Sequence, residues 1–345
     1  MALLDIWDYV RAMGDRRLRQ QGYVASGLGI LERYRRVPAF WAPHLDRNRQ
    51  NILDITAQLS GKGGTLLILG AGRLLDVPWE QIFPLFERVV LVDADHCIVP
   101  YVERIISSAR NKDIPKPIFE IADLTASVVD VAAWAESTIR AAESPVAAGK
   151  ALLEGFERSG VPQPPWARTY ADVRLAISTN LISQLGFFPR LYIQTEFKKR
   201  FNKPFGDMAK AAEGLECYFD RVRARHIHDL AAMKNAWVYV STDIAVSVYE
   251  MEPAVAAPLL KSAPPPNAGV ELDARNEVKF AWPVKIVERS DPIHGQNVKD
   301  LWPRDARLDP PKRWVWHIVP QGSEKKYMTT GRVHVVEAWT KKPDK

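Results

Sequence analysis

Residues 65–95, TLLILGAGRLLDVPWEQIFPLFERVVLVDAD, carry the pattern that decides the fold. The stretch opens with a short apolar run that ends in Gly-Ala-Gly and continues through a segment that looks helical over residues 77–86, with a proline in its first turn. It closes with a second apolar run that ends in an aspartate. Parallel strands covered by helices on both faces read as continuous apolar runs. The stretch therefore predicts a strand–helix–strand unit of a buried parallel sheet.

The same alternation continues along the chain. The expected strands are residues 65–69, 89–92, 117–121, 173–177, 237–240, 314–319 and 333–339. A polar connection with two glycines joins the last two strands, which is typical of an antiparallel hairpin. We therefore expect an α/β fold with a doubly wound, mostly parallel seven-stranded sheet, a C-terminal antiparallel hairpin and a helical N-terminal extension.

Two regions depart from this alternation. Residues 1–60 show apolar positions at helical spacing, which predicts a helical N-terminal cap. Residues 141–170 are rich in alanine and then in proline, which predicts an inserted helix and loop. The remainder, residues 61–345, is expected to be one Rossmann-like domain around the sheet.

The positive charge gathers near the N-terminus. Residues 11–49 contain nine arginines against three acidic residues, and this local excess equals the net charge of +6 of the whole chain. One interpretation is a solvated helical face, and the other is a basic lid over an anionic ligand, since guanidinium groups suit carboxylates and phosphates. Nucleic acid is disfavoured, because the nearby aromatic residues lie in helical-looking sequence rather than on a strand.

Composition excludes several classes of protein. With 345 residues, 47% of them hydrophobic, the chain can bury a core and is not disordered. No stretch approaches the roughly 20 apolar residues of a membrane span, and acidic residues stand where an export signal would be apolar. The two cysteines are far apart, so neither a disulfide scaffold nor a cysteine zinc site is expected. We expect a cytoplasmic enzyme without a metal.

Small and polar residues follow the first four strands, where ligands bind in an open parallel sheet. Gly70, Ala71 and Gly72 follow the first strand, and glycine lets the backbone approach a ligand closely. Asp93 lies 21 residues beyond Gly72, about where an acid accepts hydrogen bonds from ribose. Asp123 ends the third strand. This pattern predicts a site for an adenosine-containing ligand.

The turn after the first strand argues against a pyrophosphate. Dinucleotide-binding turns carry a third glycine and place the pyrophosphate on a helix N-terminus. Here Leu75 occupies the third position, and Asp76 puts negative charge at the expected helix start. A ligand with a sulfonium and an ammonium group, and no phosphate, tolerates that charge.

Four segments resemble the motifs of the class I, seven-stranded S-adenosylmethionine-dependent methyltransferases: LLILGAG (66–72), VVLVDAD (89–95), IADLT (121–125) and LAISTNLISQL (175–185). The resemblance implies S-adenosylmethionine as cofactor. The cofactor-binding residues it implies are Gly70, Ala71 and Gly72 at the methionine moiety, Asp93 and Ala94 at the ribose, Ala122, Asp123 and Leu124 at the adenine, and Ser178, Thr179 and Asn180 beneath the methyl donor.

Two positions depart from the family pattern. Ile68 stands where the family usually has an acid, two residues before the first glycine. The fourth motif reads Ser-Thr-Asn-Leu instead of the Asn/Asp-Pro-Pro-Tyr/Phe of amino-group methyltransferases. The second departure argues against a nucleobase amine or a glutamine as the acceptor.

Two residues are candidates for catalysis. His226 lies on the apolar stripe of a helix expected over residues 207–230, where it is either a general base or a hydrogen-bonded core histidine. Gln184 follows the Ser-Thr-Asn turn and either orients a substrate or caps a helix. Weaker candidates for an acceptor pocket, with ordinary packing or surface roles as the alternatives, are Tyr192, Glu196, Trp314 and Trp316.

The sequence therefore predicts methyl transfer from S-adenosylmethionine to a small or medium-sized acceptor molecule, which the arginines favour as anionic. Positioning of the two reactants is expected to supply most of the catalysis. Two alternatives stay open: a nicotinamide-dependent oxidoreductase, and a cofactor-binding partner protein without catalysis.

Overall fold

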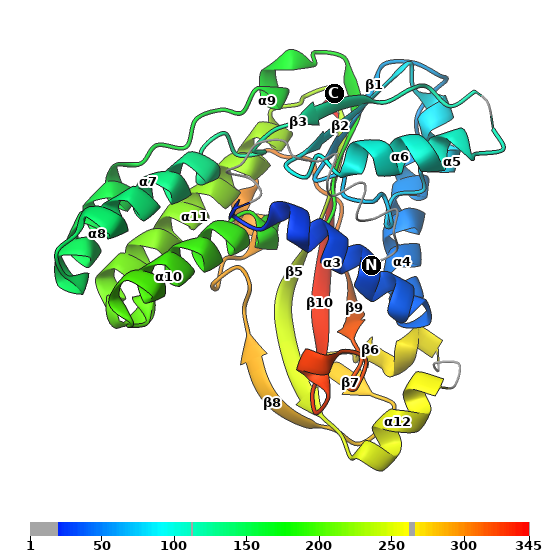
Figure 1. Ribbon diagram of the computed structural model, residues 1–345. Helices are drawn as coiled ribbons and strands as arrows, with labels where there is room; N and C mark the ends of the chain where they lie inside the picture. Colours follow the sequence, from blue (N-terminus) through cyan, green and yellow to red (C-terminus); the bar gives the residue numbers. More distant parts are fainter. Residues whose placement is uncertain (1–19, 112, 262–265, 345) are drawn as a thin grey trace.

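The computed structural model describes residues 20–111, 113–261 and 266–344, and its centre is an eight-stranded mixed sheet (Figure 1). The strands of this sheet are β1 (Thr65–Leu69), β2 (Arg88–Asp93), β3 (Ile118–Ile121), β4 (Val173–Ser178), β5 (Trp237–Glu250), β8 (Lys285–Ser290), β9 (Lys312–Val319) and β10 (Gly331–Lys341). A separate two-stranded sheet consists of β6 (Val270–Leu272) and β7 (Val278–Phe280).

Helices fill most of the connections. The α-helices are α3 (Tyr23–Arg36), α4 (Pro38–Thr56), α5 (Trp79–Ile82), α6 (Ile98–Ser107), α7 (Val128–Ala141), α8 (Pro145–Arg158), α9 (Trp166–Thr169), α10 (Phe187–Phe201), α11 (Ala209–Ala231), α12 (Pro253–Lys261) and α13 (Val298–Leu301). The 3₁₀ helices are η1 (Phe83–Leu85), η2 (Ile182–Gln184), η3 (Phe205–Asp207), η4 (Pro266–Gly269) and η5 (Lys325–Tyr327).

The strand order is β3-β2-β1-β4-β5-β10-β9, and β8 pairs with β5 outside this path. The first five strands of the path pair in parallel, whereas β10 pairs antiparallel with both β5 and β9. The seven expected strands are the seven strands of the path. The predicted α/β class, the mostly parallel sheet and the C-terminal antiparallel hairpin are confirmed.

Strand β5 is much longer than predicted. The sequence predicts a strand over residues 237–240, and the structure continues it to Glu250. Its first part pairs with β4, its later part pairs with β8, and β10 runs along both. The prediction ends early because polar residues follow Val240. Ser241, Thr242 and Asp243 are nevertheless buried, so the strand continues without an apolar signal.

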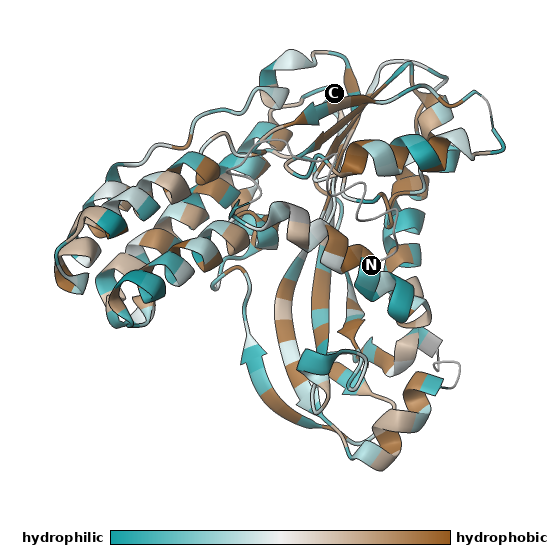
Figure 2. Ribbon diagram, viewed as in Figure 1, coloured by the Kyte–Doolittle hydropathy of each residue, from teal (hydrophilic) through white to brown (hydrophobic). Residues whose placement is uncertain are grey.

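Both faces of the parallel strands are covered by helices. Side chains of α4 and α6 pack on one face of β1, β2 and β4. Side chains of α9 and α11 pack on the opposite face of the same strands. Figure 2 shows these strands as mostly hydrophobic along their whole length, as expected for strands buried on two sides.

A second helical layer stands beside the sheet. Helices α7, α8, α10 and α11 pack together around their own apolar core (Figure 1). The expected insertion over residues 141–170 corresponds to α8 and α9, and α8 packs against α7 and α11 within this group. The interior stripe of α11 includes Leu215, Phe219 and Val222, which are all buried.

The described part of the N-terminal segment is α3 and α4; residues 1–19, with the first four of the nine arginines, lie outside the described residues. Helix α4 buries Trp41, Leu45 and Ile52 in the core. Helix α3 is held on the β9–β10 connection by an ion pair of Arg33 with Glu324.

The helix expected over residues 77–86 is shorter in the structure. It consists of α5 and the 3₁₀ turn η1, and α5 begins only at Trp79. Pro84 lies within η1 and lacks the backbone N–H that a longer α-helix would need. Within the described residues, no helix has both the length and the apolar character to cross a membrane.

Candidate functional site

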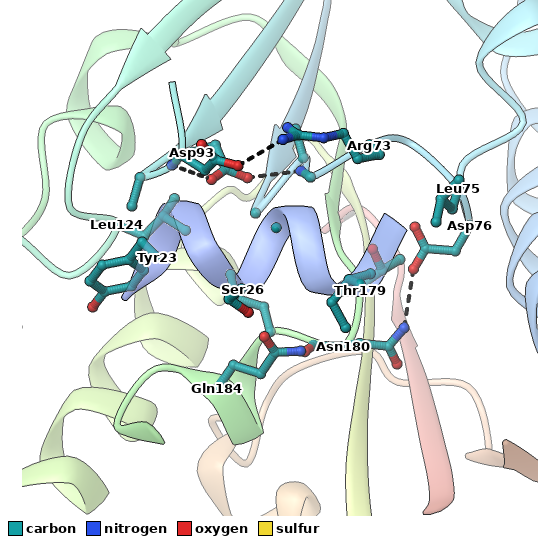
Figure 3. A pocket seen from close by; sticks show the side chains of 18 of the residues that line it. Tyr23, Ser26, Arg73, Leu75, Asp76, Asp93, Leu124, Thr179, Asn180 and Gln184 are labelled. Atoms are coloured by element: carbon teal, nitrogen blue, oxygen red, sulfur yellow. Dashed lines mark hydrogen bonds and ion pairs between the residues drawn. The ribbon is translucent and has the colours of Figure 1, made fainter. Parts of the chain in front are cut away.

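A cavity of about 190 Å³ opens where the strands β1 to β4 end. It is lined by the turns that follow these strands and by side chains of α3 and α4. Figure 3 shows α3 crossing the cavity, with Tyr23 and Ser26 beside the strand-end residues. Ten of the thirteen predicted site residues line this cavity: Gly70, Ala71, Gly72, Asp93, Ala94, Asp123, Leu124, Thr179, Asn180 and Gln184.

The glycine turn after β1 has the conformation that requires glycine. Gly70 has φ 67° and Gly72 has φ 50°, both in the left-handed region. A Cβ on Gly70 would lie 3.0 Å from Leu181 Cδ1, so the turn is also closely packed. The Gly72 N–H donates to Asp93 Oδ2 at 2.8 Å. The turn and the acid at the end of β2 thus form one unit.

Asp93 is held in place by two backbone donors. Besides the bond from Gly72, its Oδ1 accepts a hydrogen bond from the Asp95 N–H at 2.7 Å. Burial raises the pKa of the Asp93 carboxyl to about 6, against the lowering effect of these two hydrogen bonds. Near neutral pH the carboxylate is therefore ionised but titrates closer to neutrality than an ordinary aspartate.

Arg73 and Asp95 form a buried ion pair beside Asp93, 3.1 Å apart. Among the described residues, no hydrogen-bond partner meets Arg73 Nε or Nη1. Gly27 of α3 approaches this pair so closely that a Cβ there would lie 2.3 Å from Asp95 Oδ2. Sequence reasoning missed Arg73 and Asp95, although Arg73 directly follows the first motif segment and Asp95 is the last residue of the second.

Asp123 has a clear structural role. Its Oδ1 accepts hydrogen bonds from both the N–H and the hydroxyl of Thr125, and its Oδ2 accepts one from the Val129 N–H in the first turn of α7. The carboxylate still lines the cavity, where Tyr23 of α3 lies nearby. Burial raises the pKa of Tyr23 well above its usual value, and the negative charge of Asp123 adds to the effect.

Asp76 and Asn180 meet at another part of the wall. Asn180 Nδ2 donates to Asp76 Oδ2 at 3.1 Å, and Gln184 Nε2 donates to the Asn180 backbone carbonyl at 2.9 Å. Asn180, two residues after the end of β4, adopts a positive φ of 50°. Burial raises the pKa of Asp76, while hydrogen bonds from Thr179 and Asn180 oppose the shift. Gln184 thus lines the cavity and also braces the turn that holds Asn180.

Three predicted site residues, Ala122, Ser178 and His226, lie outside the cavity lining. Ser178 Oγ and His226 Nε2 are 3.0 Å apart in the interior. Burial lowers the pKa of His226 to about 4, so the ring is neutral at pH 7. These contacts agree with the hydrogen-bonded core histidine, the alternative that the sequence left open.

The weaker acceptor candidates separate into two places. The Tyr192 hydroxyl donates a hydrogen bond to Glu136, and Glu196 forms an ion pair with Lys199. Both contacts lie within the group of helices α7, α8, α10 and α11. Trp314 and Trp316 lie on one face of β9, and Trp316 lines the cavity. Of these four candidates, only Trp316 therefore lines the cavity.

His44 of α4 forms an aromatic wall with these tryptophans. Its ring stacks on Trp316 with centroids 4.2 Å apart, and Trp314 Nε1 donates to His44 Nδ1 at 3.0 Å. Burial lowers the pKa of His44 to about 3. Since Nδ1 accepts a hydrogen bond, the neutral ring carries its proton on Nε2. Sequence reasoning missed His44, because its contacts come from a strand 270 residues away.

The described arginines of the N-terminal segment do not form a basic lid, one of the two interpretations that the sequence left open. Arg36 donates to the Ser323 carbonyl at 3.2 Å, Arg33 pairs with Glu324, and Arg49 donates to the Leu75 carbonyl. None of the five described arginines between positions 33 and 49 lines the cavity. The lining instead combines one arginine, Arg73, with the aspartates Asp76, Asp93, Asp95 and Asp123.

No model of a known protein family matches the chain, and no curated protein is similar to it in sequence. Throughout the described ranges, no group of three or more histidine, cysteine, aspartate or glutamate residues is arranged to hold a metal ion.

Proposed function

We propose that this protein is an S-adenosylmethionine-dependent methyltransferase that acts on a small or medium-sized acceptor. One observation carries the proposal. The glycine turn after β1 and the acids that end β2 and β3 converge on a single cavity, and Gly72 is hydrogen-bonded to Asp93 there. These are the positions that the motif resemblance assigns to the cofactor.

The sheet supports the same proposal. The order β3-β2-β1-β4-β5 matches the first five strands of a doubly wound dinucleotide-type sheet, in which ligands bind beyond the carboxyl ends of the strands. The antiparallel hairpin β9–β10 replaces the sixth strand. We propose that the fold is the Rossmann-like sheet of the class I methyltransferases.

The turn after β1 disfavours a dinucleotide. A pyrophosphate needs the N-terminus of a helix at the glycine turn. Here α5 is only four residues long and begins at Trp79, seven positions after Gly72. Asp76 occupies the intervening segment, where it is half-buried, and it lines the cavity. Its negative charge would oppose a pyrophosphate and would stabilise the positive groups of S-adenosylmethionine.

Each part of the cavity then has a role. Asp93 would accept hydrogen bonds from the ribose hydroxyls, and the Asp123 region would hold the adenine. Asp76 and Asn180 would lie at the methionine end, and α3 would exclude water from above. Bound S-adenosylmethionine supplies an activated methyl group, and the protein aligns an acceptor with it.

Calorimetric titration with S-adenosylhomocysteine, NADH and NADPH tests the proposal. We expect S-adenosylhomocysteine to bind and to raise the melting temperature, and neither nicotinamide cofactor to do so. Binding of NADH without binding of S-adenosylhomocysteine would favour the oxidoreductase and contradict the proposal.

A further inference from the structure

Asp243 of β5 and His334 of β10 form a pair on the sheet face that α4 covers. His334 Nδ1 lies 3.1 Å from Asp243 Oδ2, and the two side chains are only 12% and 7% exposed. The three strands β5, β10 and β9 bring the neighbours together: His334 pairs in register with Val246 on one side and with Trp316 on the other. The His334 and Trp316 rings are 5.8 Å apart.

Several buried polar atoms of this cluster have no partner. Across the part of the chain that the structure describes, nothing hydrogen-bonds to His334 Nδ1, His334 Nε2, Asp243 Oδ1 or Trp316 Nε1, although Nδ1 lies at ion-pair distance from Asp243 Oδ2. An unsatisfied buried polar atom costs about 1–3 kcal/mol, so four of them together indicate a place where a ligand supplies missing partners.

The pair lies next to the wall of the cavity that Trp316 forms. Neither His334 nor Asp243 lines the cavity, but Trp316 does, and the His334 and Trp316 rings meet edge to face. Asp243 Oδ2 accepts a hydrogen bond from Ser183 Oγ at 3.3 Å, and the next residue, Gln184, lines the cavity. Ser241, two residues before Asp243 on β5, donates to Asn180 Oδ1. Through Ser183 and Ser241, the pair is therefore connected to the segment after β4, whose Asn180 we assign to the methyl donor.

The other buried histidines have their nitrogens engaged or lie elsewhere. His44 receives a hydrogen bond from Trp314 and faces the side-chain amides of Asn48 and Asn180. His317 is bonded to the Tyr249 hydroxyl and to the Ala268 carbonyl. His226 contacts Ser178 away from the cavity. His334 combines a carboxylate oxygen 3.1 Å from Nδ1 with an Nε2 that has no partner among the described residues.

We propose that His334 is the proton acceptor of the transfer reaction, that Asp243 positions it, and that the substrate is methylated on a nitrogen or oxygen that carries a hydrogen. This inference rests on the proposed function. The acceptor lone pair forms a bond to the methyl carbon, the carbon–sulfur bond breaks, and its electron pair stays on sulfur. The proton of the acceptor passes to His334 Nε2, while His334 Nδ1–H donates to Asp243 Oδ2.

The tautomer of His334 tests this assignment without knowledge of the acceptor. Protein labelled with ¹⁵N-histidine and saturated with S-adenosylhomocysteine is measured by NMR at neutral pH, and the H334N variant identifies the signal. We expect His334 to carry its proton on Nδ1 and to leave Nε2 bare, and we expect D243N to disturb this tautomer. A proton on Nε2 would overturn the assignment.

Turnover provides the second measurement. Phenols, primary amines and imidazoles are offered as acceptors, and release of S-adenosylhomocysteine is followed. For an acceptor that is methylated, H334N should lower kcat by about 10²–10⁴-fold with unchanged affinity for S-adenosylhomocysteine. The matched control is H228N, since His228 is an exposed histidine on α11. Undiminished kcat in H334N would overturn the inference alone, whereas failure of the wild type to bind S-adenosylhomocysteine would overturn the proposed function.

Discussion

At the scale of single residues, Asp93 is the side chain on which the cofactor assignment depends. Asp93→Ala should weaken the binding of S-adenosylhomocysteine by about 1.5–3 kcal/mol, the range for hydrogen bonds to a charged group. The fold should survive, because the carboxylate lies at a strand end that opens to the cavity. Calorimetry on the folded variant measures the loss, and unchanged affinity would place the ribose elsewhere.

The pKa of Asp93 adds a pH dependence to the same prediction. Burial raises this pKa to about 6, and protonation removes the acceptor capacity of the carboxylate. Affinity for S-adenosylhomocysteine should therefore be highest above pH 6 and should fall as the pH drops below it. Asp93→Asn serves as the control, since it has nothing to titrate at this position. An equal decline in that variant would assign the pH dependence to another group.

His226 should behave as a structural residue. His226→Gln removes the imidazole that meets the Ser178 hydroxyl, and an unsatisfied buried hydroxyl costs about 1–3 kcal/mol of stability. Urea unfolding should show this loss, while the affinity for S-adenosylhomocysteine stays the same. The exposed His228, changed to Gln, should alter stability by less than about 0.5 kcal/mol. A catalytic His226 would instead lose turnover with stability intact.

At the scale of elements, α3 is expected to close the cavity, and two of its glycines test that contact. Gly27 faces Asp95, whereas a Cβ on Gly29 would meet nothing within 4 Å. Glycine in a helix interior costs about 1 kcal/mol relative to alanine, so Gly29→Ala should raise the stability. Gly27→Ala should push α3 away from the Arg73–Asp95 pair and speed the dissociation of S-adenosylhomocysteine.

Melting temperatures and dissociation rates of the two variants are compared. Equal stabilisation by both substitutions, with equal dissociation rates, would mean that α3 does not press on the cavity wall.

The success of sequence reasoning also differs between elements. The parallel strands were predictable because burial on both faces makes them continuous apolar runs, and the residues that follow them were predictable because such strands end at one edge. The polar half of β5 and the short β6–β8 strands had no such signal. The contacts Gly27–Asp95, Trp314–His44 and Asp243–His334 join distant parts of the chain, so no local pattern could predict them.

At the scale of the whole molecule, buried neutral histidines should make the fold sensitive to acid. Burial lowers the pKa of His44 to about 3 and those of His226 and His317 to about 4. The unfolded chain titrates near pH 6.5, so below that pH it binds more protons than the folded protein. This contribution to stability is present above pH 6.5 and is lost as the pH falls toward 4.

Three protons bound only by the unfolded chain would change the free energy of unfolding by at most about 4 kcal/mol per pH unit. The raised pKa values of Asp93 and Asp76 act in the opposite direction and reduce this slope. Urea unfolding between about pH 7 and pH 5 measures the slope. His317→Gln should lower the slope by at most about 1.4 kcal/mol per pH unit. A stability that does not change over this range would contradict the neutral, buried state of these rings.

The central claim is that the strand-end cavity binds the methyl donor, and a crystal structure with S-adenosylhomocysteine tests it most directly. The account predicts the ribose against Asp93, the adenine beside Asp123 and Leu124, and the amino-acid end near Asp76 and Asn180, beneath α3. Density for the ligand elsewhere on the protein, with this cavity holding only water, would contradict the account.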